Sequence, residues 1–396
     1  MDMKESTRRT FIKQAGLAGL AAAAVPLACT TQDVEETILP TQEEEKPKDP
    51  TVKYETGPIG EGQPIVLAGY DYSRVKPLVD GKVKIEGCSF KYQVSGIGAL
   101  NNHAFFGAQE RDVTEIGLIP YLLAYANDDF QDYKLLPVPV LRMFRHRSVW
   151  VRKDGPINRP EDLRGKKVAT VGYSSSGLTH IRGWLASEYG VMPEEIEWVS
   201  TKKDSAANLT SGVSKYEKII PESIDMEFAP EGEDESSLLL SGLVDAIFHP
   251  AEPKCFQERH PKVRRLFEDF RSVELDYYRK TGIYPIMHSV AMKKSTKEAN
   301  PWMPQAIFEA YCKAKAMDLK NMQLLGWAYD SLPWYGQEFD NTLNELGPNF
   351  YSYGMDKSIK AYEAAFKFVY DQGLAKRKIS VEDIFEESTL SLKDIV

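Results

Sequence analysis

Short runs of alternating hydrophobic and polar residues predict strands along this chain, and stretches with helical spacing separate these runs. The predicted strands are residues 64–68, 83–85, 90–94, 112–116, 135–140, 148–152, 167–171, 197–199 and 245–248. The predicted helices include residues 119–125, 178–189 and 236–241, and the chain from Pro301 onward is largely helical. Strands that alternate with helices predict an α/β fold with mostly parallel sheets and helices on both faces.

Two extended apolar stretches, residues 144–152 and 282–290, each carry a central histidine. Roughly 130 residues lie between them, which is enough for one α/β lobe. We therefore expect a chain that begins in one lobe, crosses to a second and returns, with a ligand cleft between the lobes. The predicted lobes are residues 64–152 together with residues 285–396, and residues 153–284.

The first 29 residues have the pattern of an export signal. Arg8 and Arg9 lie in a short basic segment, and small and apolar residues follow as far as Ala28. This order is typical of a signal peptide, and the paired arginines indicate the twin-arginine route. Cys29 ends a segment that is similar to a lipoprotein cleavage box, although Pro26 stands where an aliphatic residue is usual. We expect lipidation at Cys29; the alternative is ordinary cleavage without a lipid.

Residues 30–63 are predicted to be an acidic, flexible linker. Residues 30–55 contain eight acidic residues against three lysines, and three prolines stiffen this stretch. Such a tether suits a domain that stands off a membrane on a lipid anchor. We therefore expect a periplasmic protein or a membrane-anchored lipoprotein that meets the membrane only through its lipid anchor or signal peptide.

The composition indicates a globular protein and excludes several functions. The chain has 396 residues, of which 42% are hydrophobic and 27% charged, so a large core can form without a disulfide framework. The net charge is −9 and no basic stripe is visible, so we expect no nucleic-acid partner. Cys88, Cys255 and Cys312 are odd in number and widely spaced, which favours buried free thiols. No compact metal or nucleotide motif occurs, and we expect neither a metal nor a cofactor.

Side chains that suit a carboxylate ligand occur on the first apolar stretch and around the predicted helix 178–189. Arg145 and Arg182 can hold a carboxylate through two parallel hydrogen bonds. Ser174, Ser175 and Ser176 precede the helix, where unpaired N–H groups suit an anion. The alternatives are salt bridges for the two arginines and an ordinary helix cap for the serines.

His146 and His288 are the titratable groups that the topology places best for proton transfer near neutral pH. One could protonate a carbon atom of the ligand while the other contacts an oxygen atom. The alternative is a pair of hydrogen-bonded hinge histidines without a chemical role. Further candidate binding residues follow strand ends or lie beside the expected cleft: Tyr70, Asp71, Glu115, Tyr173, His180, His249 and Trp334. Glu115 could instead pair with a buried arginine, and Trp334 could pack in the core.

Several motifs recur in the same order in one known family. They are Tyr70-Asp71, Phe144-Arg145-His146, residues 160–166, Tyr173, Arg182-Gly183, and residues 188–191, 264–267, 277–278, 281–288 and 371–374. Over residues 65–385 the chain resembles the 4,5-dihydroxyphthalate decarboxylase family, most specifically in residues 144–146 and 282–288. The resemblance implies a two-lobed fold like that of type II periplasmic binding proteins. It also implies non-oxidative loss of CO₂ from an aromatic carboxylate bound between the lobes.

Two classes of function remain open at this point. The first is a cofactor-independent carboxy-lyase of aromatic catabolism, which the extent of the resemblance favours. The second is an exported solute-binding protein of the ABC type that delivers a small aromatic or other carboxylate to a membrane permease, which the export signal favours. The signal departs from the family, whose named members are cytoplasmic, and His180 stands where the family tends to have tryptophan. A shared fold alone does not decide between the two classes.

Overall fold

The computed structural model describes residues 49–395 with the exception of residues 211 and 330. The predicted signal peptide, the predicted lipidation site Cys29 and residues 30–48 of the predicted linker lie outside the described residues. Within the described part of the chain, no helix combines the length and the apolarity that a membrane crossing requires.

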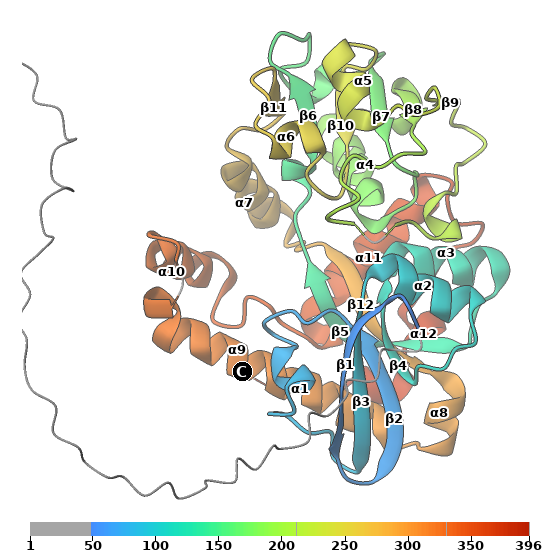
Figure 1. Ribbon diagram of the computed structural model, residues 1–396, viewed down its shortest axis with the longest axis vertical. Helices are drawn as coiled ribbons and strands as arrows, with labels where there is room; N and C mark the ends of the chain where they lie inside the picture. The colour runs from blue at the N-terminus through green and yellow to red at the C-terminus, as the bar shows by residue number, and fades with distance from the viewer. Residues whose placement is uncertain (1–48, 211, 330, 396) are drawn as a thin grey trace, which may run out of the picture. The chain divides into compact units, whose positions relative to one another are not determined.

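The first of two sheets has the strand order β1-β3-β2-β4-β12-β5 (Figure 1). Its strands are β1 (Val52–Gly60), β2 (Gln63–Gly69), β3 (Cys88–Ser95), β4 (Val113–Gly117), β5 (Tyr133–Arg142) and β12 (Ile286–Lys293). β2 is parallel to β3 and β4, whereas β12 is antiparallel to both β4 and β5. The sheet is therefore mixed rather than mostly parallel, because β12 returns from the second lobe and inserts between two strands of the first.

The linker predicted for residues 30–63 does not extend to residue 63. Residues 52–60 form β1, which pairs antiparallel with β3 from Val52 opposite Ser95 to Gly60 opposite Ser89. β1 is an edge strand, and only Val52 is buried in it. An edge strand with one solvated face tolerates the polar composition that predicted a linker. Residues 83–85, predicted as a strand, are irregular instead.

The second sheet has the order β11-β6-β10-β7-β8-β9. Its strands are β6 (Val149–Arg152), β7 (Lys167–Thr170), β8 (Glu197–Ser200), β9 (Met226–Phe228), β10 (Ala246–Phe248) and β11 (Val263–Arg265). β7 is parallel to β8 and β10, and β6 is antiparallel to β10 and β11. Residues 149–152, assigned above to the first lobe, therefore pair in the second sheet, because the chain crosses before β6 begins.

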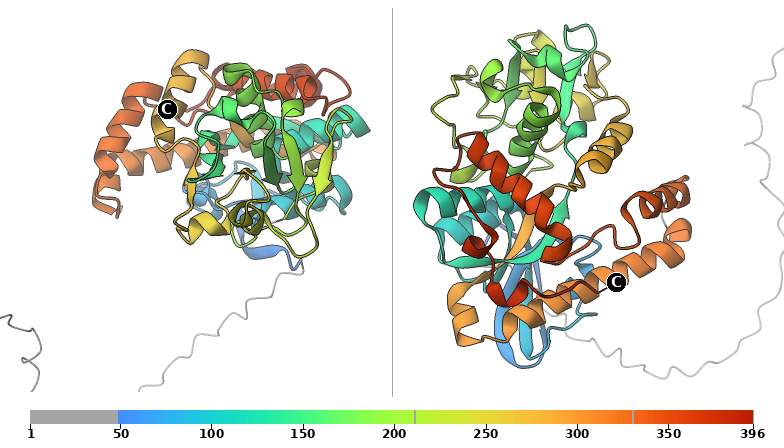
Figure 2. Two further views of the ribbon diagram at one scale, coloured as in Figure 1. Left: turned by 90° about the horizontal axis from the view of Figure 1, so that it is seen from above. Right: turned by 180° about the vertical axis from the view of Figure 1, so that it is seen from behind.

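Helices cover both faces of each sheet, as the sequence predicts for an α/β fold. They are α1 (Lys76–Val79), α2 (Ile97–Phe106), α3 (Leu118–Asp128), α4 (Ser176–Tyr189), α5 (Glu235–Ser241), α6 (Lys254–Gln257), α7 (Phe270–Thr281), α8 (Lys294–Ala299), α9 (Met303–Tyr329), α10 (Tyr335–Leu346), α11 (Met355–Asp371) and α12 (Val381–Ile384). One apolar cluster joins α1 and α9 to the first sheet, and another lies under α5 and α6. A third runs from α3 and α11 into α4, and Figure 2 shows α11 (red) at the junction of the two lobes.

The two segments that connect the lobes run side by side. Arg142, at the end of β5, is paired with Ile286, and the N–H of Met143 donates to the carbonyl of Pro285 at 3.0 Å. Further contacts join the lobes beyond this ribbon: the N–H of Ile119 donates to Ser176 Oγ, and the hydroxyl of Tyr216 donates to Asp128. The predicted two-lobed α/β architecture is confirmed. The buried free state of Cys88, Cys255 and Cys312 is confirmed as well.

Candidate functional site

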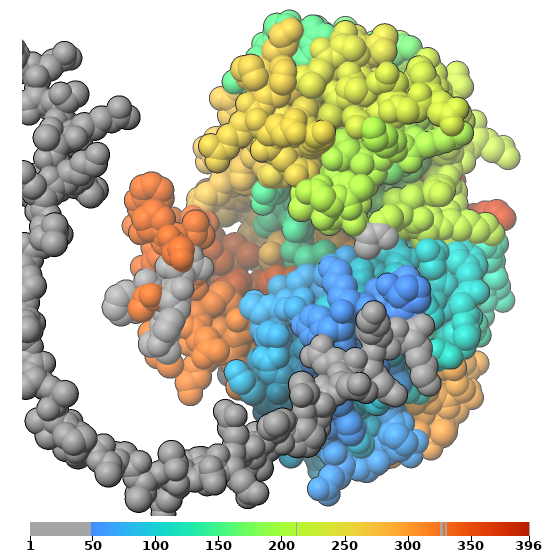
Figure 3. Space-filling view, viewed as in Figure 1, coloured from blue at the N-terminus to red at the C-terminus, as the bar shows by residue number. Residues whose placement is uncertain are grey.

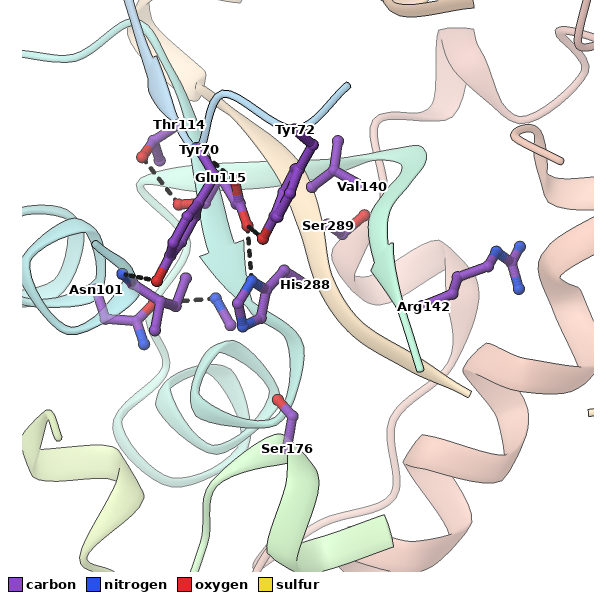
Figure 4. A network of polar contacts seen from close by, with 12 residues as sticks. Tyr70, Tyr72, Asn101, Thr114, Glu115, Val140, Arg142, Ser176, His288 and Ser289 are labelled. Carbon is purple, nitrogen blue, oxygen red and sulfur yellow. Dashed lines mark hydrogen bonds and ion pairs between the residues drawn. The ribbon is translucent and has the colours of Figure 1, made fainter. Parts of the chain in front are cut away.

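An ion pair between His288 and Glu115 forms the centre of a polar network beside the lobe junction (Figure 4). His288 Nδ1 lies 2.6 Å from Glu115 Oε1. β12 and β4 are antiparallel neighbours in which His288 is opposite Gly117 and Val290 is opposite Glu115, so the two side chains are diagonal neighbours on one face. The Glu115 side chain is 3% exposed and that of His288 is 13% exposed. The carboxylate is thus buried, while the imidazole keeps some access.

The segment after β2 supplies two tyrosines that hold the Glu115 carboxylate. The hydroxyl of Tyr72 donates to Glu115 Oε1, and the N–H of Tyr70 donates to Oε2, both at 2.9 Å. The two rings stack with centroids 5.2 Å apart. Burial and the nearby carboxylate raise the pKa of Tyr72 well above its ordinary value, so its hydroxyl remains a donor. Gly69 allows this close approach, because a Cβ there would lie 3.1 Å from Glu115 Oε2.

This arrangement determines which ring nitrogen of His288 carries a hydrogen. A carboxylate can only accept hydrogen bonds, so Nδ1 of His288 carries a hydrogen that it donates to Glu115. The other ring nitrogen, Nε2, is then the atom that can exchange a proton with a ligand, and the carboxylate stabilises the charged imidazolium. The geometry therefore supports a role for His288 as an acid or a base.

The start of α4 approaches the same network from the second lobe. Figure 4 shows Ser176 and Glu115 on opposite sides of the His288 ring. Ser176 Oγ accepts the N–H of Ile119, and Ser175 Oγ caps the helix by accepting the N–H of Leu178. Ser174 donates to the carbonyl of Tyr216 at 2.7 Å. The three hydroxyls thus fasten α4, and its backbone N–H groups are the part suited to an anion.

Arg145 lies beside the start of α4 and has no carboxylate among its hydrogen-bond partners in the described residues. Its Nη1 donates to the carbonyl of Pro250 at 2.7 Å, and its Nε contacts the sulfur of Met287 at 3.1 Å. A Cβ at Gly177 would lie 3.2 Å from Nε. Burial, with a smaller effect of Arg147, lowers the pKa of Arg145 to about 10, so it is still charged at neutral pH. A buried guanidinium whose hydrogen-bond partners are neutral groups, with Glu274 as the nearby opposite charge, suits a carboxylate ligand beside the start of α4.

Arg182 and Tyr173 occupy a different environment from Arg145. The Arg182 guanidinium lies 3.6 Å from the centroid of the Tyr173 ring, and Nε donates to Gln372 at 2.9 Å. Both side chains are fully buried, and Trp198 packs against Tyr173 edge to face. These partners describe a structural cation–π contact in the second lobe and do not support a carboxylate clamp.

His146 and His180 are buried and held neutral near pH 7. The His146 ring stacks on Trp184 with centroids 4.5 Å apart, and burial lowers its pKa to about 4. His180 packs against Phe368, and burial, with a smaller effect of Arg145, lowers its pKa to about 3. A group with so low a pKa is poorly matched to donate a proton at neutral pH. The geometry therefore favours His288 over His146 as the acid.

Three other predicted binding residues make no contact in this network. Asp71 is exposed and accepts a hydrogen bond from Tyr54 of β1 at 2.8 Å. Trp334 precedes α10 and is 79% exposed, so it neither packs in the core nor lines a buried site. His249 lies at the end of β10 in a separate cluster of the second lobe.

Two residues of the site, Tyr72 and Glu217, were not predicted from the sequence. Tyr72 lies two positions after Tyr70, in the same segment that follows β2. The signal that predicts Tyr70, a position just after a strand, applies to Tyr72 as well. Glu217, in the 3₁₀ helix Lys215–Glu217, is buried and accepts the N–H of Ser214 at 2.7 Å. Burial raises the pKa of Glu217, and the proximity of His288 and Asn101 opposes that rise. No local pattern marks Glu217, because a loop of the second lobe brings it toward the first.

A cavity of about 440 Å³ lies near the crossing segments, with Arg142, Tyr278 and Tyr284 in its lining. A second cavity of about 230 Å³ shares both tyrosines and extends along α7 and α10. Figure 3 shows the hollow beside the α9–α10 arm (orange), and Figure 4 shows Arg142 pointing away from His288. Arg142 donates to Ser358 and to the carbonyls of Tyr284 and Ser352. These contacts leave it less suited than Arg145 to bind a ligand.

Over 324 residues the chain is 30% identical to 4,5-dihydroxyphthalate decarboxylase from Comamonas testosteroni, an alignment that covers 82% of this chain and 96% of that protein. The chain belongs to the 4,5-dihydroxyphthalate decarboxylase family. A relative with the same description from Pseudomonas putida is 32% identical over 213 residues, which cover 54% of this chain and 80% of that protein. The family resemblance inferred from the motifs is confirmed.

Two further comparisons, with a second family model and with a solved structure, concern the fold of the chain. The family model described as NMT1/THI5 like matches residues 131–220. A periplasmic sulfonate-binding protein from Methylobacillus flagellatus superposes with a TM-score of 0.52 at 14% identity, over 84% of this chain and 94% of that structure. This likeness confirms the predicted periplasmic-binding-protein-like fold.

Proposed function

We propose that this protein is a carboxy-lyase that removes CO₂ from an aromatic carboxylate, with 4,5-dihydroxyphthalate as the first substrate to test. The observation that carries the proposal is the ion pair of His288 with Glu115, at 2.6 Å, in a chain of the decarboxylase family. The family supplies the class of reaction, and the ion pair supplies an acid whose proton is held in place.

The chemistry requires one bond to break and one to form. The bond between the carboxylate carbon and the ring carbon breaks, CO₂ leaves, and the electron pair stays on the ring. The protonated His288 delivers the Nε2 proton to that ring carbon, and the ring recovers its hydrogen. Glu115 stabilises the imidazolium before the transfer, and a proton from water restores it afterwards. The sum is a carboxylate and a proton that become CO₂ and the ring C–H.

Binding of the substrate uses the positively charged groups beside the start of α4. Arg145 and the backbone N–H groups at the start of α4 bind the carboxylates, since both present positive charge next to Met287 and Ser176. The stacked rings of Tyr70 and Tyr72 offer an aromatic surface for the substrate ring. No step of this proposal uses a cofactor.

The test measures CO₂ release from 4,5-dihydroxyphthalate by the purified protein. We expect turnover by the wild type, loss of most turnover in His288→Gln, and unchanged turnover in the control His260→Gln at a partly exposed position. Substrate should still raise the melting temperature of His288→Gln. If ligands raise the melting temperature of the wild type but no dihydroxyphthalate or hydroxybenzoate releases CO₂, the protein is a solute-binding protein and the proposal is wrong.

We propose in addition that the protein is exported by the twin-arginine route and lipidated at Cys29. The support is the order of Arg8, Arg9, the apolar run and Cys29 in the sequence. Changing both arginines to lysine should leave the precursor in the cytoplasm, and Cys29→Ser should release the exported protein from membranes. Normal export of the first variant, or membrane association of the second, would contradict the corresponding part.

A further inference from the structure

Asp204, Glu235 and His249 come together in the second lobe, outside the network around His288. Asp204 follows β8, Glu235 begins α5 and His249 follows β10. One potential ligand atom from each residue lies within 4.8 Å of the other two. His249 Nε2 is 3.2 Å from Asp204 Oδ1 and 3.6 Å from Glu235 Oε1. Three segments that are distant in the sequence therefore present two carboxylates and one imidazole to a common point.

Glu235 is fully buried, and one of its oxygens is left without a hydrogen bond. Oε2 accepts the N–H of Ser205 at 2.9 Å, but Oε1 has no hydrogen-bond partner among the described residues. This oxygen faces His249 from 3.6 Å, beyond hydrogen-bond distance. Buried polar atoms are nearly always paired, because an unpaired one loses its hydration without compensation. The cluster therefore lacks a partner for Glu235.

No protonation state of His249 supplies that partner. Nδ1 lies 3.0 Å from both the N–H and the carbonyl of Ala251, so it can accept from one or donate to the other. If Nε2 carries a hydrogen, it points to Asp204 at the shorter distance and leaves Glu235 unpaired. If Nε2 carries no hydrogen, its lone pair faces two carboxylates. The nearby Lys203 pairs with Asp234 instead, at 3.8 Å.

The surroundings hold the three side chains in place. Asp204 accepts hydrogen bonds from the N–H of Ala206 and the hydroxyl of Thr210, both at 2.7 Å. If Nδ1 of His249 donates to the carbonyl of Ala251, the lone pair of Nε2 is directed at the two carboxylates. This is the arrangement by which proteins orient histidine ligands of metals.

We propose that Asp204, Glu235 and His249 bind a divalent cation of the zinc or manganese type. Two carboxylates and one imidazole are ligands that both ions accept, and water completes the coordination. The cation gives Glu235 Oε1 its missing partner and neutralises the two carboxylates. It also ties the loops after β8 and β10 to α5. The proposal is independent of the decarboxylase activity.

The test measures binding of the metal alone to the full chain. After treatment with a chelator, the protein is titrated with ZnCl₂ and with MnCl₂ by calorimetry, and metal retained after desalting is counted by elemental analysis. We expect one equivalent of at least one ion, with a rise in melting temperature. Glu235→Gln should weaken binding by about tenfold or more, and the exposed control Glu231→Gln should bind like the wild type.

Two results would overturn the proposal. The first is the absence of stoichiometric zinc or manganese binding to the wild type. The second is equal affinity of the wild type and Glu235→Gln. Should Glu235→Gln fail to fold, Asp204→Asn replaces it, since the Asn oxygen can still accept the N–H of Ala206 and its NH₂ group can donate to the hydroxyl of Thr210. A higher melting temperature of Glu235→Gln without metal, together with no binding by the wild type, would show that the cluster holds a shared proton.

Discussion

His288 and His146 stand on the two segments that connect the lobes, yet their environments are opposite. His288 is paired with the Glu115 carboxylate at 2.6 Å and retains some solvent access. His146 is buried, stacks on Trp184 and has its pKa lowered to about 4. A carboxylate partner makes the first a group that can carry and transfer a proton. An aromatic cage makes the second a neutral packing element.

The same contrast separates the two arginines expected to clamp a carboxylate. Among the described residues Arg145 hydrogen-bonds a carbonyl oxygen and a thioether and no carboxylate, so its hydrogen-bonding groups can serve a ligand. Arg182 lies on the ring of Tyr173 and donates to Gln372 at the end of α11, so its charge is already used in the packing of α4. The residue type is the same within each pair, so only the contacts of each side chain distinguish a functional role from packing.

Substitution of the two histidines should have the largest effect on the rate of CO₂ release, and it tests directly whether His288 and His146 differ in function. His288→Gln should lower the rate of CO₂ release by about 10²–10⁴-fold, because a missing general acid costs that much. His146→Gln should leave the rate within about threefold once folding is verified by circular dichroism, since a neutral buried histidine supplies no proton. A larger loss in His146→Gln than in His288→Gln would reverse the assignment.

Removal of the Glu115 charge tests whether the ion pair activates His288. Glu115→Gln keeps the shape but cannot stabilise the imidazolium, so we expect kcat to fall by about 10–100-fold with a small change in KM. Substrate should still raise the melting temperature of Glu115→Gln, because the substitution leaves Arg145 and the start of α4 in place. Glu110→Gln, exposed just before β4, is the matched control. An unchanged kcat would make Glu115 a purely structural residue.

Alanine substitutions at the two arginines should separate binding from stability. Arg145→Ala should weaken substrate binding by more than tenfold, or about 1.4 kcal/mol, by calorimetry. Arg182→Ala should instead lower the free energy of unfolding by about 2 kcal/mol in urea, from the loss of the cation–π contact and a buried hydrogen bond. The exposed Arg159→Ala should change neither quantity. If Arg182→Ala binds the substrate more weakly while its free energy of unfolding is unchanged, Arg182 is a binding residue and the comparison is wrong.

The lowered pKa of His146 predicts an effect on stability alone, which appears only when the pH is lowered. The folded pKa of about 4 lies below the unfolded value of about 6.5, so protonation favours the unfolded chain. The stability that neutral His146 permits is present above pH 6.5 and falls as the pH drops toward 4, by about 3 kcal/mol. His146→Phe should remove the share of His146 from this slope in urea unfolding between pH 4.5 and 7, while His180, with a pKa lowered to about 3, keeps its own share. His260→Phe, at a partly exposed position, should retain it.

The sequence by itself determined the class of fold and much of the candidate list. Local periodicity identified most strands of both sheets, because alternation reflects which side of a strand is buried. The motifs identified the family, and residue chemistry nominated Tyr70, Glu115 and His288. The prediction was wrong for β1, since an edge strand tolerates polar residues that also suit a linker.

Only the tertiary structure decided which nominated residues act together. Glu115 and His288 are 173 positions apart, and they meet because β12 inserts beside β4 after the chain has passed through the second lobe. Glu217 and the trio of Asp204, Glu235 and His249 likewise depend on loops brought together by the second sheet. The local pattern indicates which side chains of a strand or helix face the interior. The partners and the charge state of such a side chain depend on which strands are neighbours and on how deeply it is buried. Those properties are set by the packing of the whole chain.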